Sequence, residues 1–337
     1  MKKLFLLSVA AIFICSLSFA TIRRVGFFGP AVSGVDYSTL QLAHDASATG
    51  DTIMMMPGAA TNCTMTKGLV IIGPGYFLNP SDATYPGNTG LQANSNSTEG
   101  GVITFSAGSS NSQIIGCSLA GINFNNGALS GILIKRCRLL QFNAIQFNNN
   151  ANNITFQQCT SEYVIQFSAS VIATNLSFLN CIFNGGYNNS FPPGCSGLFN
   201  NCIFVSGSLG LNSGAWQVSN CISQASLTGT NVVFNNNIGT GTQFPPGNGN
   251  QQNKSWASIF TLTGSYDGKY ALKVGSPAIG AGINGAAATD CGIFGGATPY
   301  RLSGIPSVPA IYALTSPQGT IPAGNTVQIN LSTRSNN

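Results

Sequence analysis

The chain of 337 residues carries few charges, with 13 Lys plus Arg, 8 Asp plus Glu and a formal net charge of +5. Charged residues make up 6% of the chain, whereas a typical soluble domain has roughly 25%. This composition excludes a coiled coil or a helical repeat, which needs Glu, Lys, Arg and Leu. The hydrophobic share of 43% excludes the usual disordered chain, which is poor in apolar residues. The small positive excess contains no long basic run, so we expect no nucleic-acid partner.

The first twenty residues are predicted to be a signal peptide. Two lysines precede an apolar run over residues 4–15, and a small-x-small cleavage motif ends at Ala20. The apolar run is shorter than the roughly 20 residues that a membrane-spanning helix needs. A lipoprotein signal at Cys15 is the alternative, but the bulky Ile14 stands where such a signal has a small residue. We therefore expect cleavage after Ala20, a secreted or cell-surface location and no integral membrane segment.

An internal repeat is the main signal in the rest of the chain. Six cysteines recur at intervals of 19 to 22 residues, namely Cys117, Cys137, Cys159, Cys181, Cys202 and Cys221. The pattern apolar-x-apolar-x-x-Cys leads to them, and Asn237 takes the same slot after Val232-x-Phe234. Apolar residues two apart fall on one face of a strand, and Asn and Gly punctuate the copies as turn residues. A leucine-rich repeat shares the period but would show regular leucines and helices. The repeat therefore predicts a β-solenoid with these seven residues as an interior ladder.

The repeats resemble those of the right-handed parallel β-helices of pectate lyases, polygalacturonases and many secreted bacterial proteins. Asn-Cys-Ile-Phe, which is typical of such coils, occurs at 180–183 and at 201–204. Residues 36–43 resemble the short helix that caps such proteins, and residues 300–306 are similar to tails of secreted Bacteroidota proteins. The resemblance covers about residues 25–310. It implies an all-β, right-handed parallel β-helix with an N-terminal helical cap and a short C-terminal β tail.

The predicted organisation has four parts, namely a signal peptide at 1–20, a cap at 21–50, a parallel β-helix at 51–298 and a β tail at 299–337. The β-helix segment is long enough for roughly ten coils at this period. Two loops with the sequence Phe-Pro-Pro-Gly interrupt it, at 185–197 and 243–256. Such loops either carry function or are tolerated insertions. We expect tail strands at 310–315 and 326–332, the second with one buried face because its apolar residues alternate with polar ones.

The cysteines allow two interpretations in an exported protein. Paired cysteines suggest disulfides, and stacked slots lie within the usual Cα range for such a bond. However, the ladder side chains are expected to point inward in parallel, which makes the disulfide torsion hard to satisfy. We therefore favour buried thiols that act as small hydrophobic residues. Cys195, in the first Phe-Pro-Pro-Gly loop, is expected to be the most exposed.

The sequence offers little for catalysis. Glycoside hydrolysis needs two carboxyl groups that flank the bond, and Ca²⁺-dependent lyase chemistry needs several acidic ligands. Glu162 is the only carboxylate between residues 100 and 240, and it is spaced to form an ion pair with Arg138 one coil earlier. His44, beside Asp45, is the single histidine and has no triad motif around it. The cysteine spacing does not match a zinc site. We predict no catalytic residue, no metal site and no cofactor.

Two sets of residues are candidates for ligand binding. Lys135, Arg136 and Arg138 form a basic cluster around the inward Cys137, so at least two of them are expected to face solvent. They would hold an acidic sugar or lipid headgroup, or would only keep the surface soluble. Trp256 and Tyr187, near the two Phe-Pro-Pro-Gly loops, would stack on sugar rings or pack the loops onto the solenoid.

The leading functional hypothesis is an exported, non-catalytic structural or adhesive protein of the cell surface or matrix. It would present a long face of Asn, Ser, Thr and Gly to glycans or to copies of itself. The tail strand would cap an open end of the solenoid, or would add to the next subunit and so build a head-to-tail filament. The alternatives are an extracellular polysaccharide-binding module and a polysaccharide lyase or hydrolase, the latter on resemblance alone.

Overall fold

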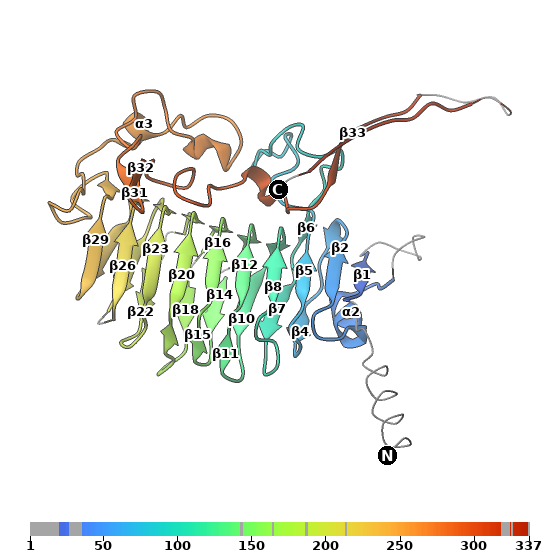
Figure 1. Cartoon of the computed structure of the whole chain (residues 1–337), viewed down its shortest axis with the longest axis horizontal. Helices are drawn as coiled ribbons and strands as arrows, with labels where there is room; N and C mark the ends of the chain where they lie inside the picture. The colour runs from blue at the N-terminus through green and yellow to red at the C-terminus, as the bar shows by residue number, and fades with distance from the viewer. Residues whose placement is uncertain are drawn as a thin grey trace, which may run out of the picture.

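The computed structural model describes residues 20–26, 36–141, 144–163, 165–185, 188–212, 214–317, 324 and 326–335. Apart from Ala20, the predicted signal peptide lies outside these residues. The chain is a right-handed parallel β-helix of about eight turns, so the predicted fold class is confirmed (Figure 1). In the part of the chain that is described, no helix is long and apolar enough to cross a membrane.

Parallel sheets run along the length of the rod. Among the described residues, the longest sheet, called the long sheet below, has ten strands: β1 (Ile22–Val25), β2 (Thr52–Met55), β5 (Val70–Ile72), β8 (Gln113–Ile115), β12 (Leu133–Lys135), β16 (Thr155–Gln157), β20 (Leu176–Leu179), β23 (Gly197–Asn200), β26 (Trp216–Ser219) and β29 (Val232–Asn235). A second sheet contains β9 (Ser118–Leu119), β13 (Arg138–Leu139), β17 (Thr160–Ser161), β21 (Ile182–Phe183), β24 (Ile203–Phe204), β27 (Ile222–Ser223) and β30 (Ile238–Gly239).

The remaining faces of the rod are formed by shorter parallel sheets. One contains β4 (Cys63–Met65), β7 (Val102–Phe105), β10 (Gly121–Phe124), β14 (Ile145–Phe147) and β18 (Ile165–Phe167), and another contains β22 (Asn188–Phe191), β25 (Ser208–Leu211) and β28 (Ser226–Gly229). Two smaller sheets complete the coils. One consists of β3 (Gly58–Ala59) and β6 (Thr98–Glu99), and the other of β11 (Leu129–Ser130), β15 (Ala151–Asn152) and β19 (Ala173–Thr174). Because β22 pairs in register with β25, part of the first Phe-Pro-Pro-Gly loop belongs to the coils.

The interior of the rod is filled by repeated side chains at equivalent slots. The six ladder cysteines and Asn237 are buried, and the nine cysteines of the described chain are free thiols. Stacked rings continue the same order, with centroids 4.5 Å apart for Phe124 and Phe147 and for Phe178 and Phe199. Cys195 is also buried, so the expectation that it is exposed is wrong. The reason is that its loop folds into the coil.

From β8 to β29, each coil leaves the long sheet through one residue with a left-handed backbone. These residues directly precede the ladder slot and form what we call the turn ladder: Gly116, Arg136, Gln158, Asn180, Asn201, Asn220 and Asn236, with φ between 53° and 67°. Gly and Asn adopt this conformation at low cost, which explains why Asn precedes the slot in four copies. Arg136 and Gln158 adopt it against their intrinsic preference.

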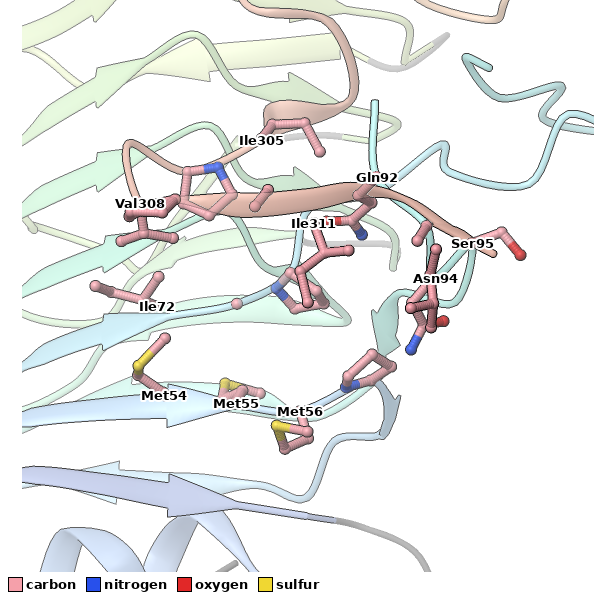
Figure 2. A pocket seen from close by; sticks show the side chains of 18 residues that line it. Met54, Met55, Met56, Ile72, Gln92, Asn94, Ser95, Ile305, Val308 and Ile311 are labelled. Atoms are coloured by element: carbon pink, nitrogen blue, oxygen red, sulfur yellow. The ribbon is translucent and has the colours of Figure 1, made fainter. Parts of the chain in front are cut away.

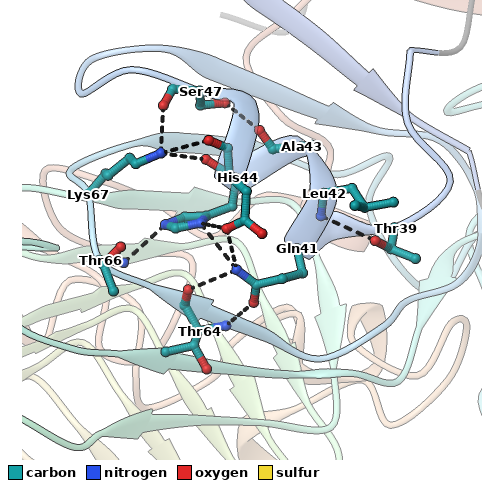
Figure 3. A network of polar contacts seen from close by, with 10 residues as sticks. Thr39, Gln41, Leu42, Ala43, His44, Ser47, Thr64, Thr66 and Lys67 are labelled. Carbon is teal, nitrogen blue, oxygen red and sulfur yellow. Dashed lines mark hydrogen bonds and ion pairs between the residues drawn. The ribbon is translucent and has the colours of Figure 1, made fainter.

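The N-terminal end of the rod is covered by the short helix α2 (Leu40–Ala46), whose first turn is capped by the Thr39 side chain. His44 is buried in this cap (Figure 3). Its Nε2 accepts a hydrogen bond from the Thr66 amide at 3.0 Å, and its Nδ1 lies 2.9 Å from Asp45 Oδ1. Since an amide N–H can only donate, the ring proton is on Nδ1 and is donated to Asp45. His44 therefore holds the cap to the first coils.

The C-terminal end of the parallel coils is closed by the second Phe-Pro-Pro-Gly loop. Phe244 of this loop is fully buried and lies 5.7 Å from the Phe234 ring, and the Gly239 amide donates to the Gln251 carbonyl at 2.9 Å. Beyond the loop, the chain forms α3 (Trp256–Ile259), η1 (Gly268–Tyr270), the antiparallel pair β31 (Gly282–Asn284) and β32 (Ala287–Thr289), and η2 (Leu302–Gly304). The named parallel strands thus end at Gly239, and the coils are shorter than the predicted range 51–298.

Residues 282–306 run back over the turn ladder toward the N-terminal end of the rod, and we call this segment the strap (Figure 1). Turn-ladder side chains donate hydrogen bonds to its carbonyls in reverse order: Asn220 to Ile283 (2.9 Å), Asn201 to Asp290 (2.9 Å), Asn180 to Ile293 (2.8 Å), Gln158 to Pro299 (2.7 Å) and Arg136 to Ile305 (2.7 Å). These bonds explain why Arg136 and Gln158 occupy the left-handed slot. The strap carries the C-terminal tail back along the coils.

The tail is the antiparallel hairpin of β33 (Ala310–Thr315) and β34 (Asn330–Arg334). The first predicted tail strand is therefore confirmed, and the second begins four residues later than expected. The expectation of a buried face on the second strand is wrong, since Val327, Ile329 and Leu331 are 45%, 60% and 55% exposed. The hairpin projects from the coils (Figure 1), so no part of the described body covers this face. Because β34 pairs with β33, it does not cap an end of the solenoid.

Candidate functional site

A groove lined mainly by side-chain amides lies at the C-terminal end of the long sheet, and we call it the amide groove. Its volume is about 520 Å³. It is lined by β23, β26 and β29, by the second Phe-Pro-Pro-Gly loop and by β31: Leu198, Phe199, Asn200, Gln217, Ser219, Asn220, Asn235, Asn236, Asn248, Ile283, Asn284 and Gly285. The wall opposite the sheet is thus supplied by the start of the strap.

The sequence places these residues side by side because the coils stack in register. Asn200 pairs with Ser219, and Ser219 pairs with Asn235. Successive strands of a sheet lie about 4.8 Å apart, so one slot of the repeat becomes a row of polar side chains. The neighbouring slot in each strand carries an interior residue such as Val218, which points to the core. Alternation along the strand therefore separates the groove from the core by one residue.

Asn220 fixes the wall of the groove. Its Nδ2 donates to Asn200 Oδ1 and to the Ile283 carbonyl, and its Oδ1 accepts from the Ile283 amide, all at 2.9 Å. Both groups of this amide are therefore committed to the protein. The bidentate contact to Ile283 resembles the pairing of two strands and holds β31 over the sheet.

Five other amides around the groove have no such partner. Gln217, Asn235, Asn236, Asn248 and Asn284 line the groove, and their side chains make no hydrogen bond to another described residue. A side-chain amide has two donor hydrogens and an acceptor oxygen. Each of these side chains is at least partly exposed. The groove thus presents a set of donors and acceptors directed to a ligand or to solvent.

The chemistry of the groove is uncharged. None of its lining residues is Asp, Glu, Lys, Arg or His. Leu198 is partly exposed and Ile283 is exposed, so each adds an apolar surface among the amides. Such a site matches a neutral ligand that carries hydroxyl groups on an apolar framework. An anionic ligand would find no counter-charge on the groove walls.

The basic cluster that the sequence suggested as a ligand site is mostly covered. Arg136 is buried under the strap, where its Nε donates to Gln158 Oε1 at 2.8 Å. Arg138 is buried as well, and its guanidinium lies 3.8 Å from the centre of the Tyr85 ring. The expectation that at least two of the three basic residues face solvent is therefore wrong. Lys135, on the outward face of β12, is only partly buried.

Glu162 joins Arg138 in a buried polar cluster at the side of the rod. The predicted ion pair is confirmed, with Arg138 Nε 3.5 Å from Glu162 Oε1. Glu162 Oε2 accepts hydrogen bonds from the Tyr266 hydroxyl at 3.0 Å and from Asn184 Nδ2 at 3.1 Å. Burial, followed by the Glu162 charge, raises the pKa of Tyr266. The Glu162 side chain is 8% exposed. Through Tyr266 it joins residues 256–281, which we call the C-terminal lobe, to the coils.

The two aromatic candidates are not part of the amide groove. Trp256 begins α3 and is half-buried, with its ring 4.7 Å from the Phe260 ring and 6.4 Å from the Tyr270 ring. It packs against the core of the C-terminal lobe. Tyr187 lies outside the described residues. Sugar stacking by either residue therefore stays a prediction.

The amide groove was missed in the sequence although part of its signal was present. Asn200 and Asn235 occupy the same outward slot of the repeat, one residue after the second apolar position. The Ile283 and Asn284 wall has no such signal, because residues that far along the chain reach the groove only when the chain reverses.

Comparison of the chain with protein-family models, with curated proteins and with solved structures found no match. The β-solenoid is accordingly assigned from the geometry of the coils. The resemblance of the repeats to those of pectate lyases and polygalacturonases is consistent with this fold. It does not place the chain in a specific repeat family.

Proposed function

We propose that the chain is an exported, non-catalytic adhesive rod that holds a neutral glycan in the amide groove. The observation that carries this proposal is the set of five unpartnered side-chain amides around an uncharged groove of about 520 Å³. Sugar hydroxyls both donate and accept hydrogen bonds, as amides do. The groove volume lies within the roughly 300–1,000 Å³ of small-ligand sites.

The support of the groove favours binding. The sheet wall is part of a stacked array, and the β31 wall is fixed by the contacts between Asn220 and Ile283. A preformed wall loses little conformational freedom when a ligand binds, so more of the interaction energy appears as affinity. The apolar side chains of Leu198 and Ile283 offer contact for the C–H faces of a sugar ring.

The carboxylates support binding over hydrolysis. Each of the eight acidic side chains has a partner in the described chain: Asp36 with Arg24, Asp45 with His44, Asp51 with Arg23, Asp82 with the Thr84 and Tyr85 amides, Glu99 with Ser97, Glu162 with Arg138, Asp267 with the Ser303 amide and Asp290 with the Gly280 amide. None of them lines the amide groove. Hydrolysis of a glycan held there would need two flanking carboxyl groups.

Affinity electrophoresis through gels that contain neutral polysaccharides tests the proposal, with a polyuronate gel as the charged comparison. The variant that carries Gln217→Glu and Asn235→Asp keeps the shape of both side chains but adds charge and removes donors. We expect retardation of the natural sequence in at least one neutral gel and at least about tenfold weaker binding by the variant.

The matched control is Gln166→Glu, which changes an exposed glutamine in β18 on another face of the rod. This control should bind as the natural sequence does. Equal retardation of all three proteins, or stronger retardation by polyuronate than by every neutral polymer, would reject the amide groove as the glycan site.

A further inference from the structure

A second groove lies at the N-terminal end of the long sheet, and its chemistry is the opposite of the first (Figure 2). This apolar groove has a volume of about 690 Å³, and none of its eighteen lining residues is charged. Met54 of β2 and Ile72 of β5 form one wall, and Ile311 and Leu314 of β33 line it from the tail hairpin. The groove therefore lies between the outward face of the sheet and the base of the hairpin.

The tail hairpin continues the apolar surface beyond the groove. Leu314 pairs with Leu331 across the hairpin, and Ile311 pairs with Thr333 two residues further along β34. Side chains two apart on a strand share a face, so Leu331 and Thr333 lie on one side of β34. Their partners Leu314 and Ile311 lie on the same side, because a register shift between Ile311 and Ala313 offsets their odd spacing in β33. Val327 and Ile329 continue the same alternation in sequence. We call these five residues the hairpin face, and their exposed fractions run from 45% to 60%.

The contacts that join the hairpin to the body lie near its base. The Ala93 amide donates to the Ile311 carbonyl at 2.7 Å, and Arg334 Nη2 donates to the Leu91 carbonyl at 2.8 Å. A two-stranded hairpin is at best marginally stable in water without a packed face. A contiguous exposed apolar patch of this kind marks an interaction site. The exposed hairpin face is therefore expected to pack against a partner.

We infer that the partner is a second copy of this chain, and that the hairpin face of each copy packs into the apolar groove of the other across a two-fold axis. The hairpin face and the groove share Ile311 and Leu314, so they form one continuous surface. A two-fold contact buries the same patch on both subunits, and it covers both halves of this surface in each copy.

Charge and size both fit this partner. Two copies meet without like-charge repulsion, since neither the groove nor the hairpin face carries a charged residue. The eighteen lining residues together with Val327, Ile329 and Leu331 number 21, and a standard stable interface has about 20–30 residues on each side. A glycan would leave these aliphatic side chains without matching groups.

This geometry predicts a closed dimer and not the head-to-tail filament that the sequence suggested. The end of the coils opposite the hairpin is closed by the loop that buries Phe244. A hairpin that extended to that end of the next copy would leave its own groove open. The two-fold contact covers the apolar groove of both copies, so growth stops at two copies.

Sedimentation velocity over a concentration series tests the inference on the chain without residues 1–20. Leu331→Asp places a charge on the hairpin face, at a side chain that is 55% exposed and so is not needed for the fold. The matched control is Val274→Asp, at an aliphatic side chain that is 98% exposed in the C-terminal lobe. We expect a monomer–dimer equilibrium for the natural sequence and for Val274→Asp. Dimerisation of Leu331→Asp should be at least about 100-fold weaker, because a buried charge has no partner.

Four results would overturn the inference. They are a monomer at all concentrations for the natural sequence, an unchanged dimer for Leu331→Asp, equal disruption by Val274→Asp, and growth beyond two copies. Flotation with phosphatidylcholine vesicles distinguishes a lipid partner from a second copy. If the natural sequence is a monomer that floats with the vesicles, and Leu331→Asp does not float, the hairpin face binds membranes. Leu331→Asp should bind glycan as the natural sequence does. If the dimer is disproved, the proposal that the amide groove binds a glycan is therefore unaffected.

Discussion

At the scale of single residues, the interior thiols show how a narrow solenoid stabilises small polar atoms. Cys137 Sγ lies 3.5 Å from the Ile114 carbonyl of the preceding coil, and Cys202 Sγ lies 3.2 Å from the Phe178 carbonyl. These contacts need a protonated S–H donor. Burial raises the pKa of the Cys202 thiol well above its usual value. Cys202 therefore donates to the preceding coil as a neutral thiol.

Alkaline pH should weaken the fold through two buried thiols outside the ladder, Cys63 and Cys291. Burial, followed by a neighbouring carboxylate, raises the pKa of Cys63 and of Cys291 from 9.0 to about 12. Because the unfolded thiol ionises first, the stabilisation is complete below pH 9 and is lost as pH rises from 9 toward 12. We expect each of these two thiols to lower the free energy of unfolding by roughly 1 kcal/mol between pH 8 and pH 10.

Urea unfolding at these two pH values measures the effect. The variant with Cys63→Ala and Cys291→Ala removes both of these thiols. Its loss of stability between pH 8 and pH 10 should be smaller than that of the natural sequence. The same pH dependence in both proteins would show that buried thiols do not control alkaline unfolding.

At the scale of the structural element, the turn ladder combines two tasks in one residue. An asparagine accepts the left-handed backbone at low cost, and its side chain reaches the strap. Asn201 has φ of 55°, and its Nδ2 donates to the Asp290 and Gly292 carbonyls at 2.9 Å and 3.1 Å. Arg136 shows that the second task can prevail, because its longer side chain reaches Ile305 from the same slot.

Two substitutions of Asn201 separate these tasks. Asn201→Gly keeps the backbone conformation but leaves two strap carbonyls without their donor, and we expect a loss of about 1–3 kcal/mol in the free energy of unfolding. Asn201→Ala adds the cost of a left-handed backbone, about 1–2 kcal/mol more. Urea unfolding of both variants measures the difference. Equal stability of the two would show that the backbone conformation is not a cost at this slot.

The repeated strands and turns of the coils were predictable from the sequence, whereas the strap that binds the turn ladder was not. Ile154-x-Phe156-x-x-Cys159 specifies a strand, an inward face and a turn within six residues, so local pattern is sufficient. The strap has no period, and its hydrogen bonds to the turn ladder join residues as far apart as Arg136 and Ile305. The signal for the strap was the run of Asn and Gln before the ladder slot, which a turn alone would not require at Gln158.

At the scale of the whole molecule, the strap changes how the solenoid holds together. A solenoid without it has contacts between neighbouring coils alone, so its ends can unfold separately. Here one segment contacts turn-ladder residues from Asn220 to Arg136. The coils between them are therefore joined by a second connection that does not pass through their neighbours.

Truncation tests this coupling. A chain that ends at Ala281 lacks the strap and the tail hairpin, whereas a chain that ends at Ser307 lacks the hairpin alone. The first chain loses the hydrogen bonds from five turn-ladder residues to the strap, at about 1 kcal/mol for each residue. We expect its Tm to fall by roughly 5–10 °C, with the second chain within about 2 °C of the full length. Calorimetry at low protein concentration measures both, and similar Tm values for the two truncated chains would contradict the role of the strap.

The candidate site shows the same division at this scale. The sheet side of the amide groove follows from the repeat, through Asn200, Gln217 and Asn235. The other wall depends on Ile283, which lies 63 residues from its partner Asn220. The basic cluster was misjudged for the same reason. A local pattern places Arg136 and Arg138 outside the core, but the strap and residues 77–85 cover that surface.

The antiparallel course of the strap ties the number of coils to the length of another part of the chain. An extra coil would lengthen the rod by about 4.8 Å, which one or two additional extended residues of the strap would span, at about 3.3 Å each. A duplicated coil also brings a new turn residue that needs a carbonyl above it. The length of the strap is thus matched to the number of coils that it covers. We expect coils to be gained or lost in evolution together with a change in the strap.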